Sequence, residues 1–330
     1  MSKPVNIAQR LTQMAGTRPY QRAIVAPMGR DQWGRVTYSQ LTFQQLDELT
    51  GHLAAELTKR GLRPGMKLVL FVPFSIEFVA LTFALFKAGV TIVLIDPGMG
   101  RKNIFACLEK VDPDGFVAIP VVQFVRWWTQ KKFSNAKFNI AVGRRSPGVT
   151  ATYRELLNKP RSEFQAVETQ SEDRAAIIFT SGSTGPPKGV LYEHGMFDAQ
   201  VDLIQQFYGI EPGEIDLPGF PLFGLFNAAM GVTTVIPDMD PTKPAKVDPE
   251  KILEAIRDQG VTQAFGSPAF WNRIGRFCER HQLQLPSLRR ALSAGGPVPT
   301  HVQERMSKIL VHPADLHTPY GATESLPISS

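Results

Sequence analysis

One stretch of the sequence, residues 179–190 (FTSGSTGPPKGV), constrains the fold and the chemistry of this chain more than any other. It follows a short apolar run, residues 175–178, of the kind that forms a buried strand. Glycines let the backbone turn sharply and bring its N–H groups close to an anion, hydroxyls add donors, and a lysine adds a mobile positive charge. These residue types in this order predict a loop that holds a triphosphate. The residues expected to hold it are Thr180, Ser181, Gly182, Ser183, Thr184, Gly185 and Lys188.

This loop does not follow the Walker A pattern of P-loop proteins. The spacing from Gly182 to Lys188 differs, and Gly189 stands where a serine or threonine would follow the lysine. A polar surface turn is the alternative interpretation, but the preceding strand and the ordered series favour a phosphate site. A helix is predicted for residues 193–207, and we interpret His194 near its start as a structural contact rather than as a ligand-binding residue.

Strand and helix patterns alternate along the chain. Residues 42–60 show helical periodicity, and the three segments that follow, 67–72, 75–87 and 90–95, are typical of a buried strand, an apolar helix and a second strand. Such alternation predicts an α/β fold whose parallel sheet is covered on both faces. A chain of 330 residues is long enough for two lobes, each with its own core.

Composition and charge exclude several classes of protein. The net charge of +6 suits an anionic ligand, and because no dense basic arm or RNA-binding signature is present we expect no nucleic-acid partner. Two cysteines, Cys107 and Cys278, are typical of a reducing compartment, and the start of the chain lacks the apolar core of a signal peptide. The longest apolar region, residues 68–95, is broken by charges, proline and glycine, so it does not predict a membrane span. We therefore expect a cytoplasmic protein.

The segment of residues 120–138 is unusual because it combines apolar and aromatic residues, including Trp127 and Trp128, with the basic residues Lys131 and Lys132. One interpretation is a helix that contacts a membrane surface or guards an apolar tunnel. The other, which we prefer at this point, is a helix packed on the sheet with a solvated basic end.

Two later motifs complement the phosphate loop. Residues 293–297 (SAGGP) follow a predicted strand, and their small side chains let a flat ring lie against the backbone. In the segment YGATE, Tyr320 is suited to stacking on a base, Thr323 to donating to a phosphate, and Glu324 to holding Mg²⁺. Alone, residues 293–297 are weak evidence and YGATE is a moderate signal. The three motifs in this order are far more specific.

In these three motifs the sequence resembles the adenylate-forming enzymes, which comprise acyl-CoA synthetases, luciferases and the adenylation domains of peptide synthetases. The resemblance covers essentially the whole chain. It implies the large N-terminal domain of such an enzyme, built from two αβα lobes with mostly parallel sheets and with the nucleotide at their junction. We expect residues 1–60 and 208–330 to form one lobe, and residues 61–207 to form the second lobe, which carries the phosphate loop.

The resemblance also implies a reaction and its cofactors, ATP and Mg²⁺. A substrate carboxylate attacks the α-phosphate of ATP, giving an acyl-adenylate and pyrophosphate, so that the protein mainly positions groups and neutralises charge. The implied nucleotide-binding residues are those of the phosphate loop together with Gly295, Gly296, Pro297, Tyr320, Gly321 and Thr323. The implied metal-binding residues are Glu324 and Thr184. The implied catalytic residues are Lys188, Thr323 and Glu324.

One departure from the family pattern bears on the substrate. Acyl-CoA synthetases commonly carry a histidine after the aromatic stretch that matches residues 220–223, and this chain has Gly224 there. Residues 220–231 and 235–252 instead resemble the olefin β-lactone synthetase branch. That branch implies adenylation of a long-chain β-hydroxy acid whose own hydroxyl then closes a β-lactone and releases AMP, without CoA. The residues expected to line an acyl pocket are Phe220, Phe223, Gly224 and Phe226.

Two other functions stay open alongside this one: a fatty acyl-CoA ligase, and a nucleotide-binding module without catalysis. The β-lactone interpretation also allows partner enzymes of a hydrocarbon pathway. The family continues beyond YGATE with a ribose-binding aspartate, an arginine, a hinge and a C-terminal lid that carries a lysine, whereas only residues 325–330 follow here. We therefore expect a truncated fragment without the lid, one that folds and binds ATP or AMP weakly but adenylates poorly.

Overall fold

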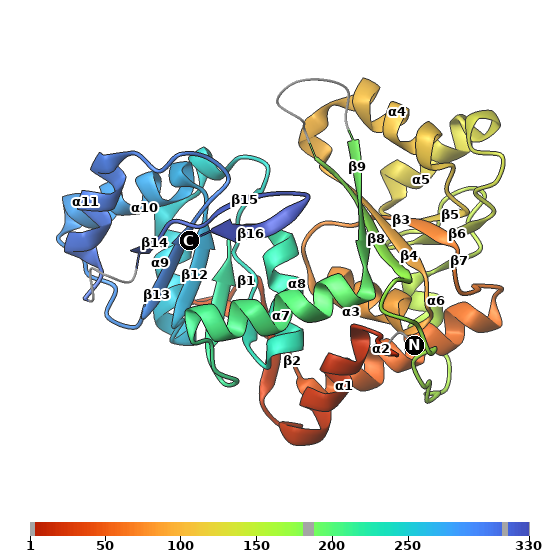
Figure 1. Ribbon diagram of the computed structural model, residues 1–330, viewed down its shortest axis with the longest axis horizontal. Helices are drawn as coiled ribbons and strands as arrows, with labels where there is room; N and C mark the ends of the chain where they lie inside the picture. Colours follow the sequence, from red (N-terminus) through yellow and green to blue (C-terminus); the bar gives the residue numbers. More distant parts are fainter. Residues whose placement is uncertain (1–3, 181–187, 312–315, 330) are drawn as a thin grey trace. The chain divides into compact units, whose positions relative to one another are not determined.

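The chain folds into two compact units, each built around a seven-stranded sheet (Figure 1). The computed structural model describes residues 4–180, 188–311 and 316–329. Unit 1 contains Met1–Gly16 and Gln44–Asp202, and unit 2 contains Thr17–Phe43 and Leu203–Ser330. The prediction of an α/β fold with two mostly parallel sheets is confirmed.

The expected boundaries on the N-terminal side were wrong, because residues 1–16 and 44–60 belong with the phosphate-loop unit. Long-range contacts explain the assignment. The Asn6 side-chain amide donates to the Phe86 carbonyl oxygen at 2.9 Å. The Lys87 ammonium, buried at the end of a core helix, lies 2.7 Å from a carboxylate oxygen of Asp47. Neither contact joins residues close enough in sequence for a local pattern to predict it.

The sheet of unit 1 is parallel apart from one edge strand. Its strand order is β7-β6-β5-β3-β4-β8-β9, and β9 runs antiparallel to β8. The strands are β3 (Lys67–Phe71), β4 (Thr91–Ile95), β5 (Gly115–Ala118), β6 (Phe138–Ala141), β7 (Ala151–Thr152), β8 (Arg174–Thr180) and β9 (Lys188–Glu193). The helices are α1 (Ala8–Thr17), α2 (Phe43–Lys59), α3 (Ile76–Lys87), α4 (Arg101–Val111), α5 (Pro120–Trp128) and α6 (Tyr153–Leu157), with the short 3₁₀ turns η1 (Pro97–Met99) and η2 (Gln130–Lys132). Helix α7 (His194–Tyr208) begins in unit 1, and its residues from 203 onward belong to unit 2.

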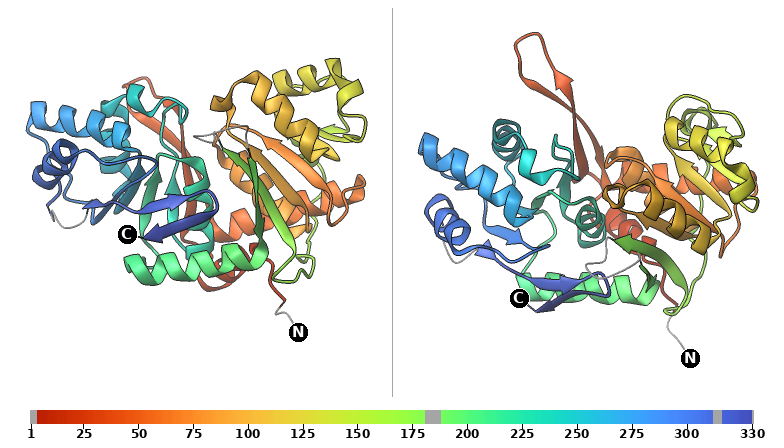
Figure 2. Two further views of the ribbon diagram at one scale, coloured as in Figure 1. Left: turned by 45° about the horizontal axis from the view of Figure 1, so that its top comes forward. Right: turned by 90° about the horizontal axis from the view of Figure 1, so that it is seen from above.

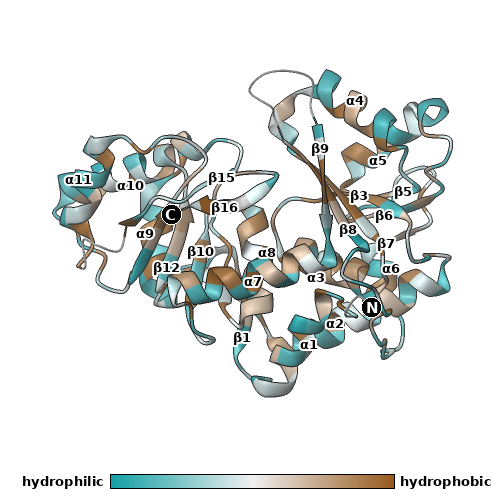
Figure 3. Cartoon of the chain, viewed as in Figure 1, coloured by the Kyte–Doolittle hydropathy of each residue, from teal (hydrophilic) through white to brown (hydrophobic). Residues whose placement is uncertain are grey.

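The apolar strands of unit 1 are covered by helices, as a parallel sheet requires. The central strands carry continuous runs of hydrophobic residues, which Figure 3 shows in brown along β3, β4 and β8. Helix α3 is apolar almost all round and is buried from Phe78 to Lys87. Its N-terminus is fixed by Ser75, whose hydroxyl oxygen accepts a hydrogen bond from the Phe78 N–H at 3.2 Å.

Unit 2 repeats this architecture with the strand order β14-β13-β12-β10-β11-β1-β2, in which only β2 is antiparallel to its neighbour. The strands are β1 (Arg22–Arg30), β2 (Val36–Thr42), β10 (Ile215–Pro218), β11 (Thr233–Val235), β12 (Gln263–Gly266), β13 (Arg290–Ser293) and β14 (Leu316–His317), with a separate pair β15 (Tyr320–Ala322) and β16 (Ser325–Ser329). The helices are α8 (Pro221–Met230), α9 (Pro249–Gln259), α10 (Pro268–His281) and α11 (Thr300–Ile309), with the 3₁₀ turn η3 (Pro244–Lys246).

The core of unit 2 lies between its sheet and helices α9, α10 and α11. Trp271 is fully buried there, and its indole N–H donates to the Leu292 carbonyl oxygen at 2.8 Å, which ties α10 to β13. The β1–β2 hairpin extends from the sheet as a two-stranded arm (Figure 2). Within the described residues, every helix is too short or too polar to cross a membrane.

Candidate functional site

The phosphate loop of unit 1 lies between two neighbouring antiparallel strands. Strand β8 ends at Thr180 and β9 begins at Lys188, and these two residues face each other in the register of the pair. Lys188 is exposed at the start of β9. Of the predicted loop residues, Ser181, Gly182, Ser183, Thr184 and Gly185 lie outside the described residues. The structure therefore places the two ends of the predicted loop side by side, with the lysine at one of them.

Strand β9 itself was missed by sequence reasoning, which treated residues up to Val190 as loop. Its backbone pairs with β8 from Lys188 to Glu193. Gly189 shows why a glycine follows the lysine: a β-carbon there would lie 2.6 Å from Cζ of Phe179 and 3.0 Å from Cγ2 of Ile177. This glycine allows the close packing of the two strands.

In unit 2, two predicted motifs follow neighbouring parallel strands. Strand β13 pairs with β14 in parallel, so the residues after both strands emerge at the same carboxyl edge of the sheet. Residues 294–299 follow β13, and residues 318–320 follow β14. Ligands of open α/β sheets bind at this edge. The topology therefore brings the predicted adenine turn and Tyr320 to the same end of unit 2.

The backbone of the predicted adenine turn is open. Gly295 has φ of +91°, a conformation that favours glycine, and a β-carbon built on either Gly295 or Gly296 would meet no described atom within 4 Å. Gly295, Gly296 and Pro297 are all exposed. Ser293, the last residue of β13, has a buried hydroxyl with no hydrogen-bond partner among the described residues. A flat ring can approach this turn without displacing a side chain.

The YGATE segment forms a hairpin, which the sequence did not predict. Tyr320 begins β15 with 66% of its surface exposed. Ala322 pairs with Ser325, so Thr323 and Glu324 form the two-residue turn between β15 and β16. Glu324 is exposed, while Thr323 and Gly321 are partly buried. The hairpin thus presents a large aromatic ring and a carboxylate to the outside of unit 2.

The residues expected to line an acyl pocket follow β10 at the same carboxyl edge. The Gly219 N–H donates to the Phe265 carbonyl oxygen at 2.7 Å, and the ring centroids of Phe223 and Phe265 lie 4.1 Å apart. Phe220 packs on Phe223 with a centroid distance of 5.8 Å and stays 39% exposed.

The other two residues expected in the acyl pocket lie further along α8, and neither is exposed: Phe226 is partly buried and Gly224 is buried. The Gly224 carbonyl accepts a hydrogen bond from the Thr234 hydroxyl at 3.2 Å, which joins α8 to β11. The aromatic pair formed by Phe220 and Phe223 is therefore the better candidate for contact with an apolar ligand.

A buried polar network beneath α8 was also missed. The Asn227 amide donates to Oδ2 of Asp216 at 2.7 Å and to the Thr234 hydroxyl at 3.1 Å, which holds α8 against β10 and β11. Burial raises the pKa of Asp216 to about 7. Nearby, the Arg290 guanidinium forms a 2.8 Å ion pair with Glu214. The sequence signal was Asp216 within a short, otherwise apolar strand, with a second acidic residue, Glu214, just before that strand.

His194 is a structural contact, as predicted. It is fully buried in unit 1, and its Nδ1 accepts a hydrogen bond from the Ile7 N–H at 3.2 Å. The ring meets Phe86 edge-on at a centroid distance of 5.8 Å. Burial lowers the pKa of this imidazole to about 4, so it is neutral at physiological pH.

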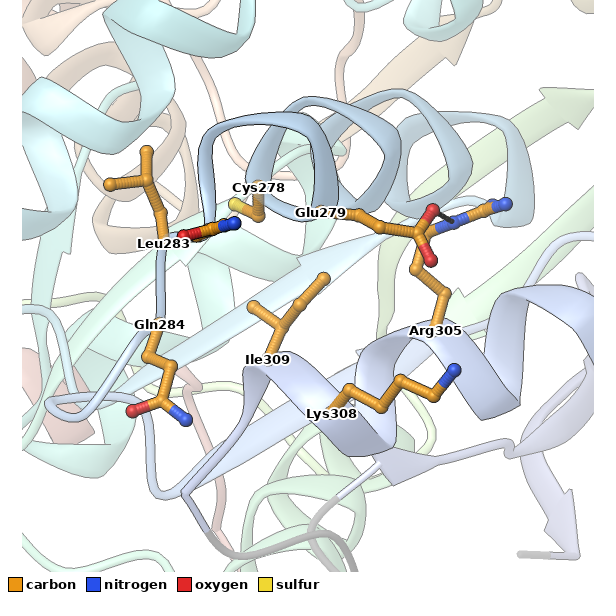
Figure 4. Close-up of a pocket in the computed structure, with 8 residues that line it drawn as sticks. Cys278, Glu279, Leu283, Gln284, Arg305, Lys308 and Ile309 are labelled. Carbon is orange, nitrogen blue, oxygen red and sulfur yellow. Dashed lines mark hydrogen bonds and ion pairs between the residues drawn. The ribbon is translucent and has the colours of Figure 1, made fainter.

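A separate hollow of about 410 Å³ lies between α10 and α11 (Figure 4). Its lining includes Glu279 and Arg305, which form a 3.0 Å ion pair, and Lys308. The hollow opens beside residues 282–284, which precede β13, so it lies away from the carboxyl edge that carries the motifs. None of the predicted site residues lines it.

The donor chemistry fits a magnesium–nucleotide complex better than a metal held by protein ligands alone. The described residues contain no group of three or more His, Cys, Asp or Glu side chains able to hold a metal ion. Magnesium usually keeps several waters and binds through one or two carboxylates plus substrate phosphates. The exposed carboxylate of Glu324 meets that requirement when a nucleotide supplies the phosphates.

These features define an α/β protein of the nucleotide-binding class, with glycine turns and a hydroxyl-rich loop after parallel strands. The family model described as AMP-binding enzyme matches residues 11–330, and the chain belongs to this family. The chain is 43% identical to an olefin beta-lactone synthetase of Stenotrophomonas maltophilia and 41% identical to one of Xanthomonas campestris, each match covering 100% of this chain and 59% of the relative. The resemblance to this branch is thereby confirmed.

A solved structure shows the same fold. The long-chain-fatty-acid–CoA ligase FadD1 of Archaeoglobus fulgidus superposes with a TM-score of 0.83 over 99% of this chain and 66% of that protein, at 21% identity. The chain spans about three fifths of the length of the two olefin beta-lactone synthetases.

Proposed function

We propose that this chain is the nucleotide-binding and acid-binding part of an enzyme that activates a carboxylic acid with ATP through an acyl-adenylate. The observation that carries the proposal is the arrangement at the carboxyl edge of unit 2. The open backbone of Gly295 and Gly296 and the exposed ring of Tyr320 follow the paired strands β13 and β14. Membership of the AMP-binding enzyme family supports an adenine nucleotide as the ligand.

In the proposed reaction, a carboxylate oxygen of the substrate attacks the α-phosphorus of ATP. A new C(O)–O–P bond forms, the bond from the α-phosphorus to the bridging oxygen breaks, and pyrophosphate leaves with that electron pair. No protein base is needed because the nucleophile is already charged. Lys188 would neutralise the leaving pyrophosphate, Thr323 would donate to the α-phosphate, and Glu324 would hold the magnesium ion, which screens the phosphate charges.

We propose a long-chain β-hydroxy acid as the substrate. Support comes from the two relatives above 40% identity, which are both olefin beta-lactone synthetases and match the whole chain. The partly exposed pair Phe220 and Phe223 gives an apolar surface at the carboxyl edge. After adenylation, the β-hydroxyl oxygen would attack the activated carbonyl carbon, the bond to AMP would break, and the hydroxyl proton would pass to solvent. An internal nucleophile gains from proximity, so no CoA is required.

A reducing compartment, and hence the cytoplasm, is the proposed place of action. Cys107 and Cys278 are both free and buried, and they lie in different units. Burial raises the pKa of the Cys278 thiol to about 11, so this cysteine stays protonated and unreactive.

A product assay tests the proposed function. The protein is incubated with MgATP and a synthetic long-chain β-hydroxy acid, with and without CoA. We expect AMP and a β-lactone in both cases, and Lys188→Ala should lose most of the AMP release while Lys246→Ala, on an exposed surface, should not. The matching acid without the hydroxyl should give no lactone. A thioester formed from plain fatty acids only when CoA is present would instead identify a fatty acyl-CoA ligase.

A further inference from the structure

Helix α5 of unit 1 presents its apolar side to solvent and its polar side to the protein. Gln123 and Arg126 are buried, with exposed fractions of 0% and 7%. Four apolar residues spaced as one helical stripe are exposed instead. Their exposed fractions are 62% for Val121, 49% for Phe124, 42% for Val125 and 76% for Trp128. This is the reverse of the usual orientation of a surface helix.

Specific hydrogen bonds fix this orientation. The Gln123 amide donates to the carbonyl oxygens of Phe116 on β5 and Ile140 on β6, at 3.0 and 2.9 Å. The Arg126 guanidinium donates to Oε1 of Gln123 at 2.9 Å and to the Gly148 carbonyl oxygen at 2.9 Å. Because rotating the helix would leave both buried side chains without these partners, the apolar stripe is held outward.

The surroundings of the stripe are basic. Residues 115–154 contain seven Lys and Arg residues and no Asp or Glu. Lys131 is exposed just beyond the C-terminal end of α5. Arg144 is exposed in the loop at the other end, where a β-carbon on the neighbouring Gly143 would lie 3.2 Å from Cγ of Pro120. Cations that form no ion pair with any described residue therefore flank the stripe at both ends.

Two further cations nearby form ion pairs with acidic residues. The Lys132 ammonium lies 2.7 Å from Glu109, and the Arg145 guanidinium lies 2.6 Å from Glu155. All four of these side chains are about half exposed, so the pairs are weak and solvated. The basic character of this face remains after they are taken into account.

We propose that α5 and its flanking cations, Lys131 and Arg144, dock unit 1 on the surface of an anionic lipid bilayer. The stripe combines aromatic and aliphatic residues, and it is bordered by cations, which is the composition of helices that lie in a membrane interface. Phosphate headgroups would neutralise the cations while the rings enter the boundary of the acyl chains. The helix lies on the bilayer and does not cross it. This inference does not rest on the proposed function.

Vesicle co-sedimentation tests the proposal. The probes are vesicles of phosphatidylcholine alone and vesicles with about one quarter phosphatidylglycerol. We expect the bound fraction to be at least about fivefold higher on the anionic vesicles and to fall as salt is raised. The variant Phe124→Ser/Trp128→Ser should lose about tenfold in binding. Lys131→Glu/Arg144→Glu should lose the preference for anionic lipid with the stripe intact.

Matched controls separate docking from general stickiness and from misfolding. Met28→Ser/Trp33→Ser removes two comparably exposed apolar side chains from the β1–β2 arm and should bind vesicles like the wild type. Circular dichroism should show an unchanged fold for every variant. Equal vesicle binding by wild type and Phe124→Ser/Trp128→Ser would overturn the proposal. So would a lack of vesicle binding combined with loss of self-association in that variant, because the stripe would then be a protein interface.

Discussion

The phenyl ring of Phe179 lies across Gly189 on the neighbouring strand, so close that a β-carbon at Gly189 would be 2.6 Å from Cζ of the ring. The two residues face each other in the β8–β9 pair and are adjacent in sequence to Thr180 and Lys188, which form the next facing pair. The ends of the phosphate loop are thus held together by a large residue that fills the space left by a glycine. The predicted phosphate loop and the packing of β8 against β9 therefore depend on the same short stretch of sequence.

Replacing Gly189 with alanine should therefore disturb the lysine next to it. The added methyl group must displace Phe179 or the strand, at a cost of about 1–3 kcal/mol. We expect a lower free energy of unfolding in urea and weaker ATP binding, and the second change Phe179→Leu should restore part of both. Gly16→Ala is the control, since a β-carbon there meets no described atom within 4 Å. Unchanged stability and ATP affinity in Gly189→Ala would show that the ring does not constrain the loop.

Tyr320→Ala should weaken nucleotide binding while Tyr320→Phe should not. Stacking of a base on an aromatic ring contributes about 1–3 kcal/mol, which corresponds to a roughly five- to 150-fold rise in Kd when the ring is lost. Titration calorimetry with AMP measures this. Tyr20→Ala is a suitable control because Tyr20 is 85% exposed and carries no predicted role. An affinity for AMP that is the same in Tyr320→Ala as in the wild type would exclude stacking on this ring.

The buried carboxyl of Asp216 should make stability depend on pH. Its pKa is raised from 3.8 in the unfolded chain to about 7 in the folded protein, chiefly by burial. The folded protein therefore holds a proton that the unfolded chain releases, so this group favours folding at low pH and loses that contribution as pH rises from about 4 to about 7. The full effect is on the order of a few kcal/mol.

Urea unfolding of wild type and Asp216→Asn across this pH range measures the effect. The variant keeps an acceptor for Asn227 and removes the titrating group, so its stability relative to the wild type should rise with pH and level off above about 7. A difference between the two proteins that is the same at every pH would contradict the raised pKa.

The buried imidazole of His194 should change the pH dependence of stability in the opposite direction. Burial lowers the pKa of its imidazole from 6.5 to about 4, so the unfolded chain binds a proton that the folded protein does not. Stability is then lost as pH falls from about 6.5 to about 4. Because this trend offsets that of Asp216, each must be measured as the difference between wild type and variant. The difference in the free energy of unfolding between wild type and His194→Gln should vary with pH over that range, and a difference that is the same at every pH would contradict the lowered pKa.

The sequence predicted those parts of the fold that local patterns encode. Helix α2 runs from Phe43 to Lys59 where residues 42–60 were expected, because its apolar period is regular. The alternation of strand and helix patterns, which predicted the parallel sheets, can likewise be read from neighbouring residues. Strand β9 was missed because half of its residues are exposed and the strand carries no alternating pattern. Its existence depends on pairing with β8.

Contacts between distant residues account for what the sequence did not reveal. The place of residues 1–16 in unit 1 depends on bonds such as that from Asn6 to Phe86. A helix was expected at α5, but the sequence did not show which side of it faces the protein. That orientation is set by the hydrogen bonds that the Gln123 amide donates to carbonyl groups of β5 and β6. At the site, the motifs supplied the candidate residues. The parallel pairing of β13 with β14 then showed that the adenine turn and Tyr320 emerge at one edge.

The exchange of labelled pyrophosphate into ATP tests acid activation most directly, because it reports formation of the acyl-adenylate whatever step follows. The protein is assayed with a long-chain β-hydroxy acid. We predict exchange that requires the acid and falls at least about a hundredfold in Lys188→Ala and Glu324→Gln but not in Lys246→Ala. A protein that binds ATP yet shows no exchange with any carboxylic acid would be a nucleotide-binding module, and acid activation would be excluded.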